Sequence, residues 1–222
     1  MEFPFLEPEE IAGRANSLCR EAFGELPDGP VDLDALLFDH LYEHHGVAFF
    51  KDRPLDPQDG QRVLGMTYPL ANEIHVDSRL AQSDQVGRYR FTVAHEIGHW
   101  VLHRPLFLDA HDVDDDAHIV TLERDVVEAD QDSYHPEEWQ ANHFAISLLL
   151  NDDALRTHFH ERFGEPPLEY DPGSEHDSPR DYSRHVATAE PGDYPCLCEV
   201  FRLSAEATAI ALEERGYVDL PE

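Results

Sequence analysis

Two histidines four residues apart, His95 and His99, constrain the fold of this chain more than any other feature of the sequence. On an α-helix, residues at i and i+4 lie on the same face, so both imidazole rings can reach one metal ion. The neighbouring residues are apolar at helical spacing, which predicts a helix buried in the core: Phe91, Val93, Ala94, Ile97, Trp100, Val101 and Leu102. Buried imidazoles without partners would be costly, and a metal ion would supply the partner.

Glu96 follows the first histidine and would stand beside the metal ion rather than on it. Zinc lowers the pKa of a bound water from near 16 to about 7, and a neighbouring carboxylate can take the proton and pass it to a leaving amine. The pattern His-Glu-x-x-His is therefore typical of hydrolytic zinc sites. The alternative is a pair of surface histidines that bind nothing.

A catalytic zinc ion usually has three protein ligands, so the two histidines leave the site incomplete. We predict Glu138 as the third ligand, on a helix that begins at Pro136 and runs to Leu150 without a breaker. Asn142 lies one turn after Glu138 and could accept the ring N–H of a liganding histidine. Glu137 competes for the ligand position, and Glu138 could also be an ordinary acidic residue in the first turn of a helix.

His103 continues the helix face of His95 and His99 but is not expected to bind the same ion. Eight residues of helix rise about 12 Å, which is too far for His95 and His103 to share one metal. No glycine between His99 and His103 offers a break in the helix. We predict that His103 supports a ligand or the structure instead.

Two stretches together resemble a known family. The run Arg-Phe-Thr-Val-Ala-His-Glu-Ile-Gly-His at residues 90–99, followed by Glu138-x-x-Ala141-Asn142-x-Phe144-Ala145, is similar to the ImmA/IrrE metallopeptidases. Weaker similarity in the flanks extends the match over most of residues 7–217.

The resemblance implies a single zincin-like α+β domain over residues 1–222, with a small antiparallel sheet packed on a bundle of helices around the active site. It implies one Zn²⁺ per chain held by His95, His99 and Glu138, with Glu96 as the general base. Family members act in the bacterial cytoplasm and cut a helix-turn-helix repressor, which releases stress-response or mobile-element genes and so regulates transcription.

The composition is strongly acidic, with 47 Asp and Glu against 16 Lys and Arg, a net charge of −31 and Lys51 as the only lysine. This sign of charge opposes direct binding to nucleic acid, because no phosphate would be neutralised. An acidic surface that is poor in lysine also suits a halophilic source with a high-salt cytoplasm. A merely acidic protein, or one that mimics nucleic acid, would have the same composition.

The chain has only three cysteines, Cys19, Cys196 and Cys198. An odd number this small cannot make a disulfide framework, which favours a reducing compartment. The Cys-x-Cys pair could bind metal, but without a second pair we expect plain thiols. The first residues contain no basic segment with an apolar run, and no stretch reaches transmembrane length. We therefore expect a cytoplasmic protein without a membrane anchor.

Local patterns predict helices at residues 8–23, 31–45 and 152–162, and strands at 47–50, 63–68 and 73–76 that pair in an antiparallel sheet. Residues 109–133 form an acidic insertion, which we expect to be solvated or to act as a lid. Within it, residues 112–123 resemble a calcium loop, but Ala117 stands where that loop needs glycine, so we do not expect Ca²⁺.

Residues 164–195 are rich in Pro and Gly and are predicted to be a long loop or linker. Four of its side chains could stabilise an oxyanion, with no basis for choosing among them: Tyr170, His176, Tyr182 and His185. A pair of short helices is expected at residues 197–217, with Ser204 as the cap of the second.

These patterns predict a cytoplasmic zinc metalloendopeptidase that hydrolyses a peptide bond in a protein regulator. One alternative is a non-catalytic regulatory or toxin–antitoxin binding module with a structural metal site. Another is a peptidase that acts on small peptides.

Overall fold

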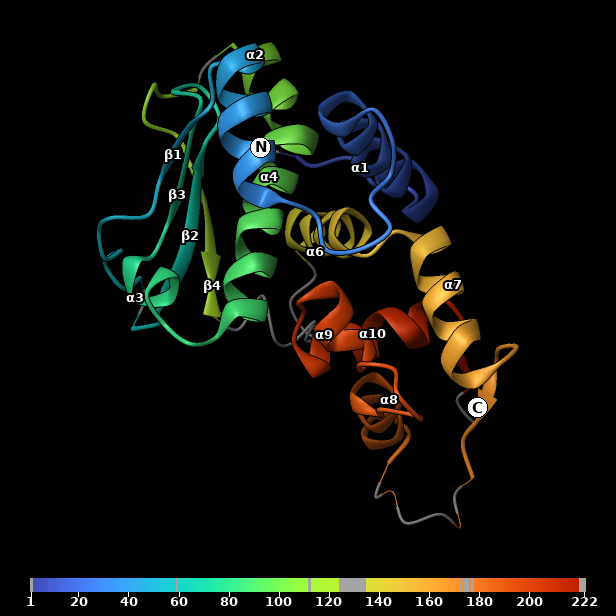
Figure 1. The fold of residues 1–222 in the computed structure, drawn as a ribbon. Coiled ribbons are helices and arrows are strands. Elements are labelled where there is room, and N and C mark those ends of the chain that lie inside the picture. The colour runs from blue at the N-terminus through green and yellow to red at the C-terminus, as the bar shows by residue number, and fades with distance from the viewer. Residues whose placement is uncertain are drawn as a thin grey trace. The chain divides into compact units, whose positions relative to one another are not determined.

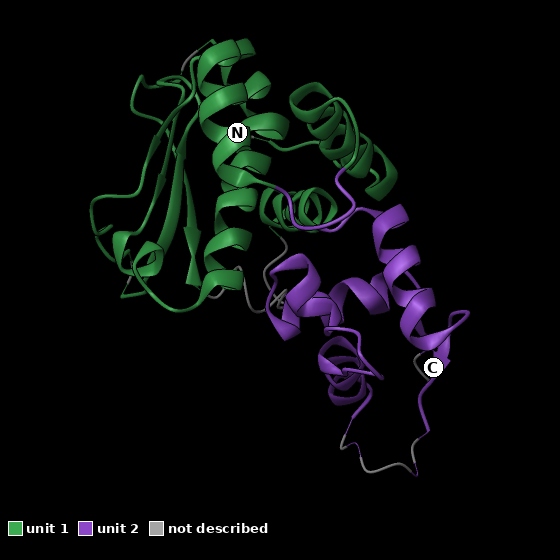
Figure 2. Ribbon diagram, in the orientation of Figure 1, with its two compact units in different colours: residues 1–26, 32–149 green, residues 27–31, 150–222 purple. Residues whose placement is uncertain are grey.

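A computed structural model describes residues 2–58, 60–111, 113–123, 135–171, 173, 176 and 178–219 (Figure 1). The chain divides into two compact units, shown in two colours in Figure 2. Unit 1 comprises residues 1–26 and 32–149, and unit 2 comprises residues 27–31 and 150–222. Unit 1 holds both histidines and Glu138. The single domain over residues 1–222 remains a prediction.

The first helix, α1 (Pro8–Phe23), follows from its end signals. Proline stands in the first turn, where no N–H is needed, and Gly24 ends the helix in the left-handed conformation at φ 82°. A second helical segment consists of the π-helical η1 (Ala35–Tyr42) and α2 (Glu43–His45), and it ends at Gly46 with φ 68°. The Oδ1 atom of Asp32 accepts the Ala35 N–H at 3.0 Å at the start of this segment.

Four strands form the sheet of unit 1: β1 (Ala48–Phe50), β2 (Val63–Tyr68), β3 (Glu73–Val76) and β4 (Ile119–Leu122). Their order is β1-β3-β2-β4, so β1 and β4 are the edges. The α+β class is as predicted, but the sheet is mixed rather than purely antiparallel, because β1 pairs with β3 in parallel. Two parallel strands need a crossover connection, and here the chain between β1 and β3, which includes β2, supplies it.

Strand β4 lies inside the segment predicted as an acidic insertion, so that prediction is wrong for residues 119–122. Ile119 and Thr121 are buried against the core, and the strand pairs with β2. The short β-branched run Ile119-Val120-Thr121 was the available signal, hidden by the acids around it. Residues 112 and 124–133 of the predicted insertion, which include one end of the calcium-loop pattern, lie outside the described residues.

Helix α4 (Val86–Asp109) runs along the sheet and contacts β2 and β3, preceded by the short α3 (Ser78–Ala81). Helix α6 (Pro136–Leu149) packs against both α4 and α1, on the side of α4 away from the strands (Figure 1). Both helices carry candidate ligands, and their extensive contact brings those ligands together.

Unit 2 contains α7 (Asp152–Phe163), α8 (Pro179–Thr188), α9 (Leu197–Phe201) and α10 (Ala205–Glu214). Two short strands, β5 (Leu168–Glu169) and β6 (Val218–Asp219), pair in parallel. The C-terminal helix pair is present, and the Ser204 hydroxyl accepts the Ala207 N–H at 3.1 Å at the start of α10.

Helix α8 corrects the prediction of a loop over residues 164–195. Ser178 caps it by accepting the Asp181 N–H at 3.1 Å, and Pro179 occupies the first turn. Val186 and Ala187 are buried on its inner side. The many Pro and Gly residues around this helix masked a regular Ser-Pro start signal.

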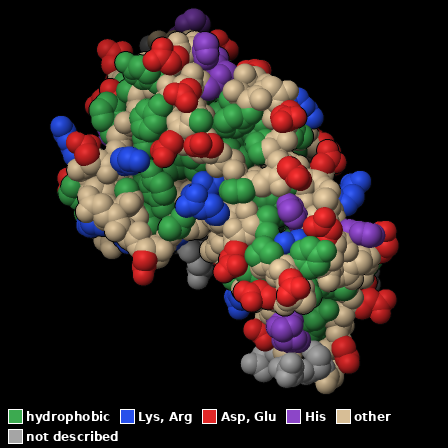
Figure 3. Space-filling model, in the orientation of Figure 1, with side chains coloured by type: hydrophobic (Ala, Val, Ile, Leu, Met, Phe, Trp, Pro, Cys, Tyr) green, Lys and Arg blue, Asp and Glu red, His purple; other side chains and the backbone are tan. Residues whose placement is uncertain are grey.

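Acidic side chains are spread over the face of the molecule in Figure 3, with few basic ones among them. This distribution agrees with the net charge of −31. Within the described residues, no helix has the length and apolarity needed to cross a membrane.

Candidate metal centre

The two histidines of α4 turn toward each other in the core of unit 1. His95 and His99 are both completely buried, and their Nε2 atoms lie 2.9 Å apart. The helix is continuous from Val86 to Asp109, so the i and i+4 spacing holds as predicted. Two ring nitrogens that converge in a buried place need a shared partner, either a proton or a metal ion.

Glu138 reaches the same point from α6. Its Oε2 lies 3.1 Å from Nε2 of His95, and its Oε1 lies 3.3 Å from Nε2 of His99. Burial by itself would raise the pKa of Glu138, but the neighbouring His99 and His95 outweigh burial and hold that pKa well below its usual range. Glu137, the competing residue, instead lies 3.4 Å from Nδ1 of the exposed His135.

The three side chains have the donor set and the spacing of a metal site. One ligand atom from each of His95, His99 and Glu138 lies within 4.8 Å of the others. Ligand atoms placed 2.0–2.1 Å from a tetrahedral zinc ion are about 3.3 Å apart, close to the three separations of 2.9, 3.1 and 3.3 Å. Two imidazoles and a carboxylate are also a known donor set for catalytic zinc. The residues therefore fit a zinc ion.

Hydrogen bonds at Nδ1, the ring nitrogen that faces away from Glu138, orient both imidazoles. Nδ1 of His95 lies 2.9 Å from Oδ1 of Asn142, the pairing that the i and i+4 spacing of Asn142 and Glu138 predicted. An amide oxygen only accepts, so Nδ1 of His95 carries the proton and Nε2 keeps a free lone pair toward the centre. A ring in this tautomer is ready to bind a metal ion.

A longer chain of hydrogen bonds supports His99. Nδ1 of His99 lies 3.0 Å from Nδ1 of His103, and Nε2 of His103 lies 3.1 Å from Oε1 of Gln140. The Gln140 amide then donates to the carbonyl of Pro4 at 2.7 Å. If Nε2 of His99 faces a metal ion, every donor in this chain points away from the centre, from His99 toward Pro4.

His103 is neutral in this arrangement. Burial and, to a smaller extent, the nearby His99 lower its pKa to about 3, although the hydrogen bond with Gln140 opposes the shift. The ring of Phe3 also meets His103 edge-on, with 5.0 Å between the ring centroids. The sequence did not single out Gln140 or the segment around Pro4, because no local spacing links either to the histidine motif.

Glu96 lies where α4 meets strand β2 of the sheet. It is completely buried, and its Oε2 accepts the Thr67 hydroxyl at 2.6 Å. Its Oε1 makes no hydrogen bond with the described residues. Burial raises the pKa of Glu96, and the nearby His99 and His95 and the hydroxyls of Thr121 and Thr67 oppose that increase.

Gly65 on β2 leaves the room that the Glu96 carboxylate fills. A Cβ atom at residue 65 would lie 2.1 Å from Oε1 of Glu96 and 2.6 Å from its Cδ. Only glycine therefore lets β2 pass so close to Glu96. Neither Gly65 nor Thr67 was recognised from the sequence, since both belong to a strand 29 or more residues before Glu96.

Comparison with protein families decides which kind of protein this geometry belongs to. The model of the Peptidase_M78 family, described as an IrrE N-terminal-like domain, matches residues 43–165. The chain belongs to the M78 peptidase family. This result confirms the resemblance to ImmA/IrrE proteins. Membership of this family makes the chain a peptidase, and a peptidase family implies a protein substrate. No protein with a curated function matches the chain.

The M78 match spans every residue of the candidate centre, from Gly65 on β2 to Asn142 on α6. Most of unit 2 lies after it. The four predicted oxyanion candidates belong to unit 2 and gather there: the ring of His176 lies 5.2 Å from that of Tyr182 and 4.7 Å from that of His185. Tyr170 donates its hydroxyl to the His176 carbonyl at 3.3 Å. Their role remains a prediction.

Proposed function

We propose that this M78 protein is a zinc-dependent endopeptidase in which His95, His99 and Glu138 hold one Zn²⁺ and Glu96 is the general base. The observation that carries this proposal is the convergence of three buried ligand atoms from α4 and α6 within 4.8 Å. Burial and the ring nitrogens that face inward also support it.

The bound ion would polarise the peptide carbonyl and acidify the attacking water. The chain's own residues do the rest. Oε1 of Glu96 takes the proton from the water and passes it to the leaving amine, while Thr67 holds the other carboxylate oxygen in place. Asn142 and His103 fix the tautomers of His95 and His99, and Glu138 stays ionised because the imidazoles stabilise its negative charge.

The substrate that we propose is a protein regulator in the cytoplasm, and specifically a helix-turn-helix repressor. This part rests on analogy with the family and on no residue of this chain. The acidic surface supports a substrate that is protein rather than nucleic acid.

The first test is the metal content of the purified protein by mass spectrometry. We expect one zinc per chain in the parent and none in His95→Ala or Glu138→Ala. Glu137→Ala is the matched control, because Glu137 is adjacent on the same helix and pairs with His135 instead, so this variant should keep its zinc. A parent that takes up no metal, even after incubation with zinc, would overturn the proposal.

Cleavage is then tested by incubating the zinc-loaded protein with a pool of proteome-derived peptides and proteins and identifying new termini by mass spectrometry. Glu96→Gln should retain zinc but produce no new termini. Cleavage of short peptides alone would favour a peptidase of small peptides.

One observation favours the non-catalytic alternative. His95 and His99 are completely inaccessible to solvent and Glu138 is 9 % exposed, and closed sites of this kind are typical of structural metals. Zinc binding without cleavage of any protein or peptide would support a regulatory binding module with a structural metal site.

A further inference from the structure

Four side chains that can bind metal gather within ten residues of unit 2: Glu190, Cys196, Cys198 and Glu199, here called the Cys–Glu cluster. The two sulfur atoms lie 3.0 Å apart. One ligand atom from each of Glu190, Cys196 and Glu199 lies within 4.8 Å of the others. We propose that the Cys–Glu cluster is a second metal site, which takes a divalent ion with affinity for thiolates, such as Zn²⁺.

The backbone holds the two cysteines close together. The Cys196 carbonyl accepts the N–H groups of Glu199 and Val200 at 3.1 Å each, so the chain turns back as α9 begins. This turn places Cys198 beside Cys196 and brings Glu199 to the same side. Cys196 is buried at 4 % exposure, whereas Cys198 is half-buried and accessible to an ion.

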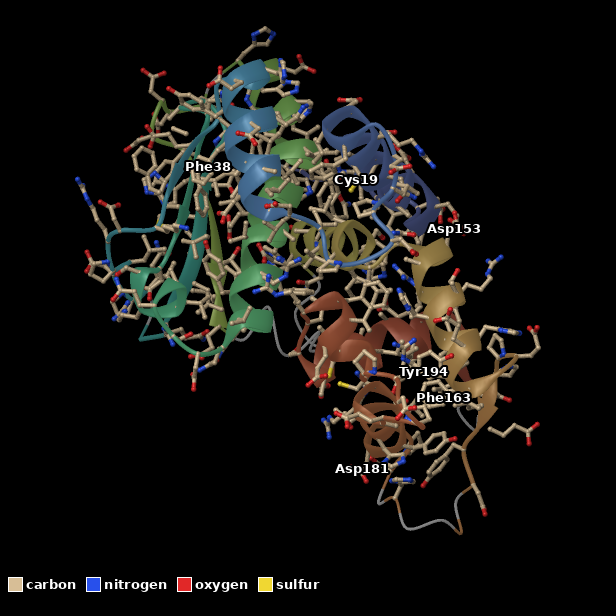
Figure 4. The ribbon with its side chains drawn as sticks, in the orientation of Figure 1. Cys19, Phe38, Asp153, Phe163, Asp181 and Tyr194 are labelled. Atoms are coloured by element: carbon tan, nitrogen blue, oxygen red, sulfur yellow. The ribbon has the colours of Figure 1, made fainter. Side chains whose placement is uncertain are left out.

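The loop before the cysteines is held in place as well. Arg162 on α7 donates from Nε to the Pro195 carbonyl at 2.9 Å, and its guanidinium lies 5.2 Å from the ring centroid of Tyr194, the residue labelled in Figure 4. The Tyr194 N–H is directed at the Pro191 carbonyl at 3.5 Å. A ligand loop that is ordered before binding loses less entropy when the ion arrives.

The donor chemistry selects a thiophilic ion. Two thiolates and two carboxylates make a four-ligand set, and thiolates favour Zn²⁺ over the hard cations Mg²⁺ and Ca²⁺. Sulfur atoms 2.3 Å from a tetrahedral zinc ion are about 3.8 Å apart, so the pair must open by somewhat less than 1 Å. A small rotation of the half-buried Cys198 side chain provides that change.

The thiols are not arranged as reactive nucleophiles. Burial and, to a smaller extent, the adjacent Cys196 raise the pKa of Cys198 to about 12. Reactive cysteines have lowered pKa values and positive neighbours, whereas Cys196 lies beside the carboxylates of Glu190 and Glu199. A metal ion is the partner that would displace both protons and offset the negative charge.

This proposal is independent of the peptidase reaction, because the Cys–Glu cluster shares no residue with the candidate centre of unit 1. It also differs in donor type, which allows the two sites to be told apart by spectroscopy. Cobalt(II) bound by thiolates absorbs strongly in the near ultraviolet through sulfur-to-metal charge transfer. Cobalt(II) bound by imidazoles and a carboxylate does not.

The experiment is a titration of the reduced, metal-free full chain with Co²⁺, followed by absorbance and by metal content. We expect a charge-transfer band in the parent that disappears when Zn²⁺ displaces the cobalt. The band should be lost in Cys196→Ser and Cys198→Ser and retained in Cys19→Ser, the matched control, because Cys19 lies on α1 of unit 1 (Figure 4).

Glu190→Gln and Glu199→Gln should weaken cobalt binding without removing the sulfur band, and neither change disturbs the buried thiol. His95→Ala should keep the band while losing one metal per chain. The proposal is overturned if the parent shows no charge-transfer band, or if the band is as strong in Cys196→Ser and Cys198→Ser as in the parent. It is also overturned if the two thiols only form a disulfide and bind no cobalt after reduction.

Discussion

Replacing Gly65 by alanine tests the placement of Glu96 most directly. The new Cβ would lie 2.1 Å from Oε1, 2.6 Å from Cδ and 2.8 Å from Cγ of Glu96, whereas ordinary contact begins at 3.4 Å. Oε1 must therefore move by more than about 1 Å, or β2 must shift away from α4. Glu96 is completely buried and hydrogen-bonded to Thr67, so its carboxylate cannot move away without displacing other atoms or breaking that bond.

The magnitude follows from two effects. Overpacking a well-packed core costs about 1–3 kcal/mol, and leaving a buried carboxylate or hydroxyl unpaired costs about 1–3 kcal/mol. We expect the free energy of unfolding of Gly65→Ala to fall by about 2–4 kcal/mol. A displacement of about 1 Å in a catalytic group lowers the rate by roughly 10²-fold, so cleavage should fall by that factor while zinc remains bound.

Urea unfolding followed by tryptophan fluorescence measures the stability change in unit 1, because both tryptophans, Trp100 and Trp139, lie on its helices α4 and α6. Gly13→Ala is the matched control. Residue 13 is exposed on α1 with nothing within 4 Å of a new Cβ, so this change should stabilise the protein by about 0.5–1 kcal/mol. Parent-like stability and cleavage in Gly65→Ala would refute the close packing of β2 on Glu96.

Three further predictions concern supporting residues. Asn142→Ala removes the acceptor of the His95 ring, and zinc affinity measured by competition with a chelator should fall about 10- to 100-fold. Burial alone would raise the pKa of Asp77, but Arg79 and other donors lower it to about 2. The stability that ionised Asp77 gives the folded protein is therefore present above about pH 4 and is lost as the pH falls through 2. Asp77→Ala should therefore cost about 2–4 kcal/mol in urea unfolding at pH 7, and less as the pH falls from 4 toward 2; an equal cost at all pH values would contradict this. Ser178→Ala should destabilise α8 by about 0.5–2 kcal/mol, measured by hydrogen exchange of the backbone amides of unit 2 as the temperature is raised. Unchanged protection of the α8 amides from exchange would count against the Ser178 cap.

The sequence predicts those parts of the candidate centre that depend on local spacing. His95 and His99 share a face because of helical periodicity alone, and Pro136 marks the start of the helix that presents Glu138. Asn142 follows Glu138 by one turn, so its contact with His95 needed only the assumption that the two helices pack together. These inferences required no knowledge of the sheet.

Contacts between distant elements were beyond local reasoning. Thr67 meets Glu96 from 29 residues away, and nothing near either residue indicates the pairing. Gln140 joins His103 to Pro4, which is 136 residues before it in the chain. The parallel pairing of β1 with β3 is likewise decided by the path of the connecting chain, whereas the alternation of residues in each strand is the same for both directions.

The placement of the three proposed ligands on two helices has a thermodynamic consequence. His95 and Glu138 are 43 residues apart, so the unfolded chain offers an ion only the adjacent histidines and not the complete set. Zinc would then bind the folded unit 1 much more tightly than the unfolded chain, and mass action would add about 2.7 kcal/mol of stability when free zinc is 100 times its dissociation constant. The concentration of free zinc would therefore set the temperature or urea concentration at which half of unit 1 is unfolded. A chelator would lower that midpoint although the sequence is unchanged.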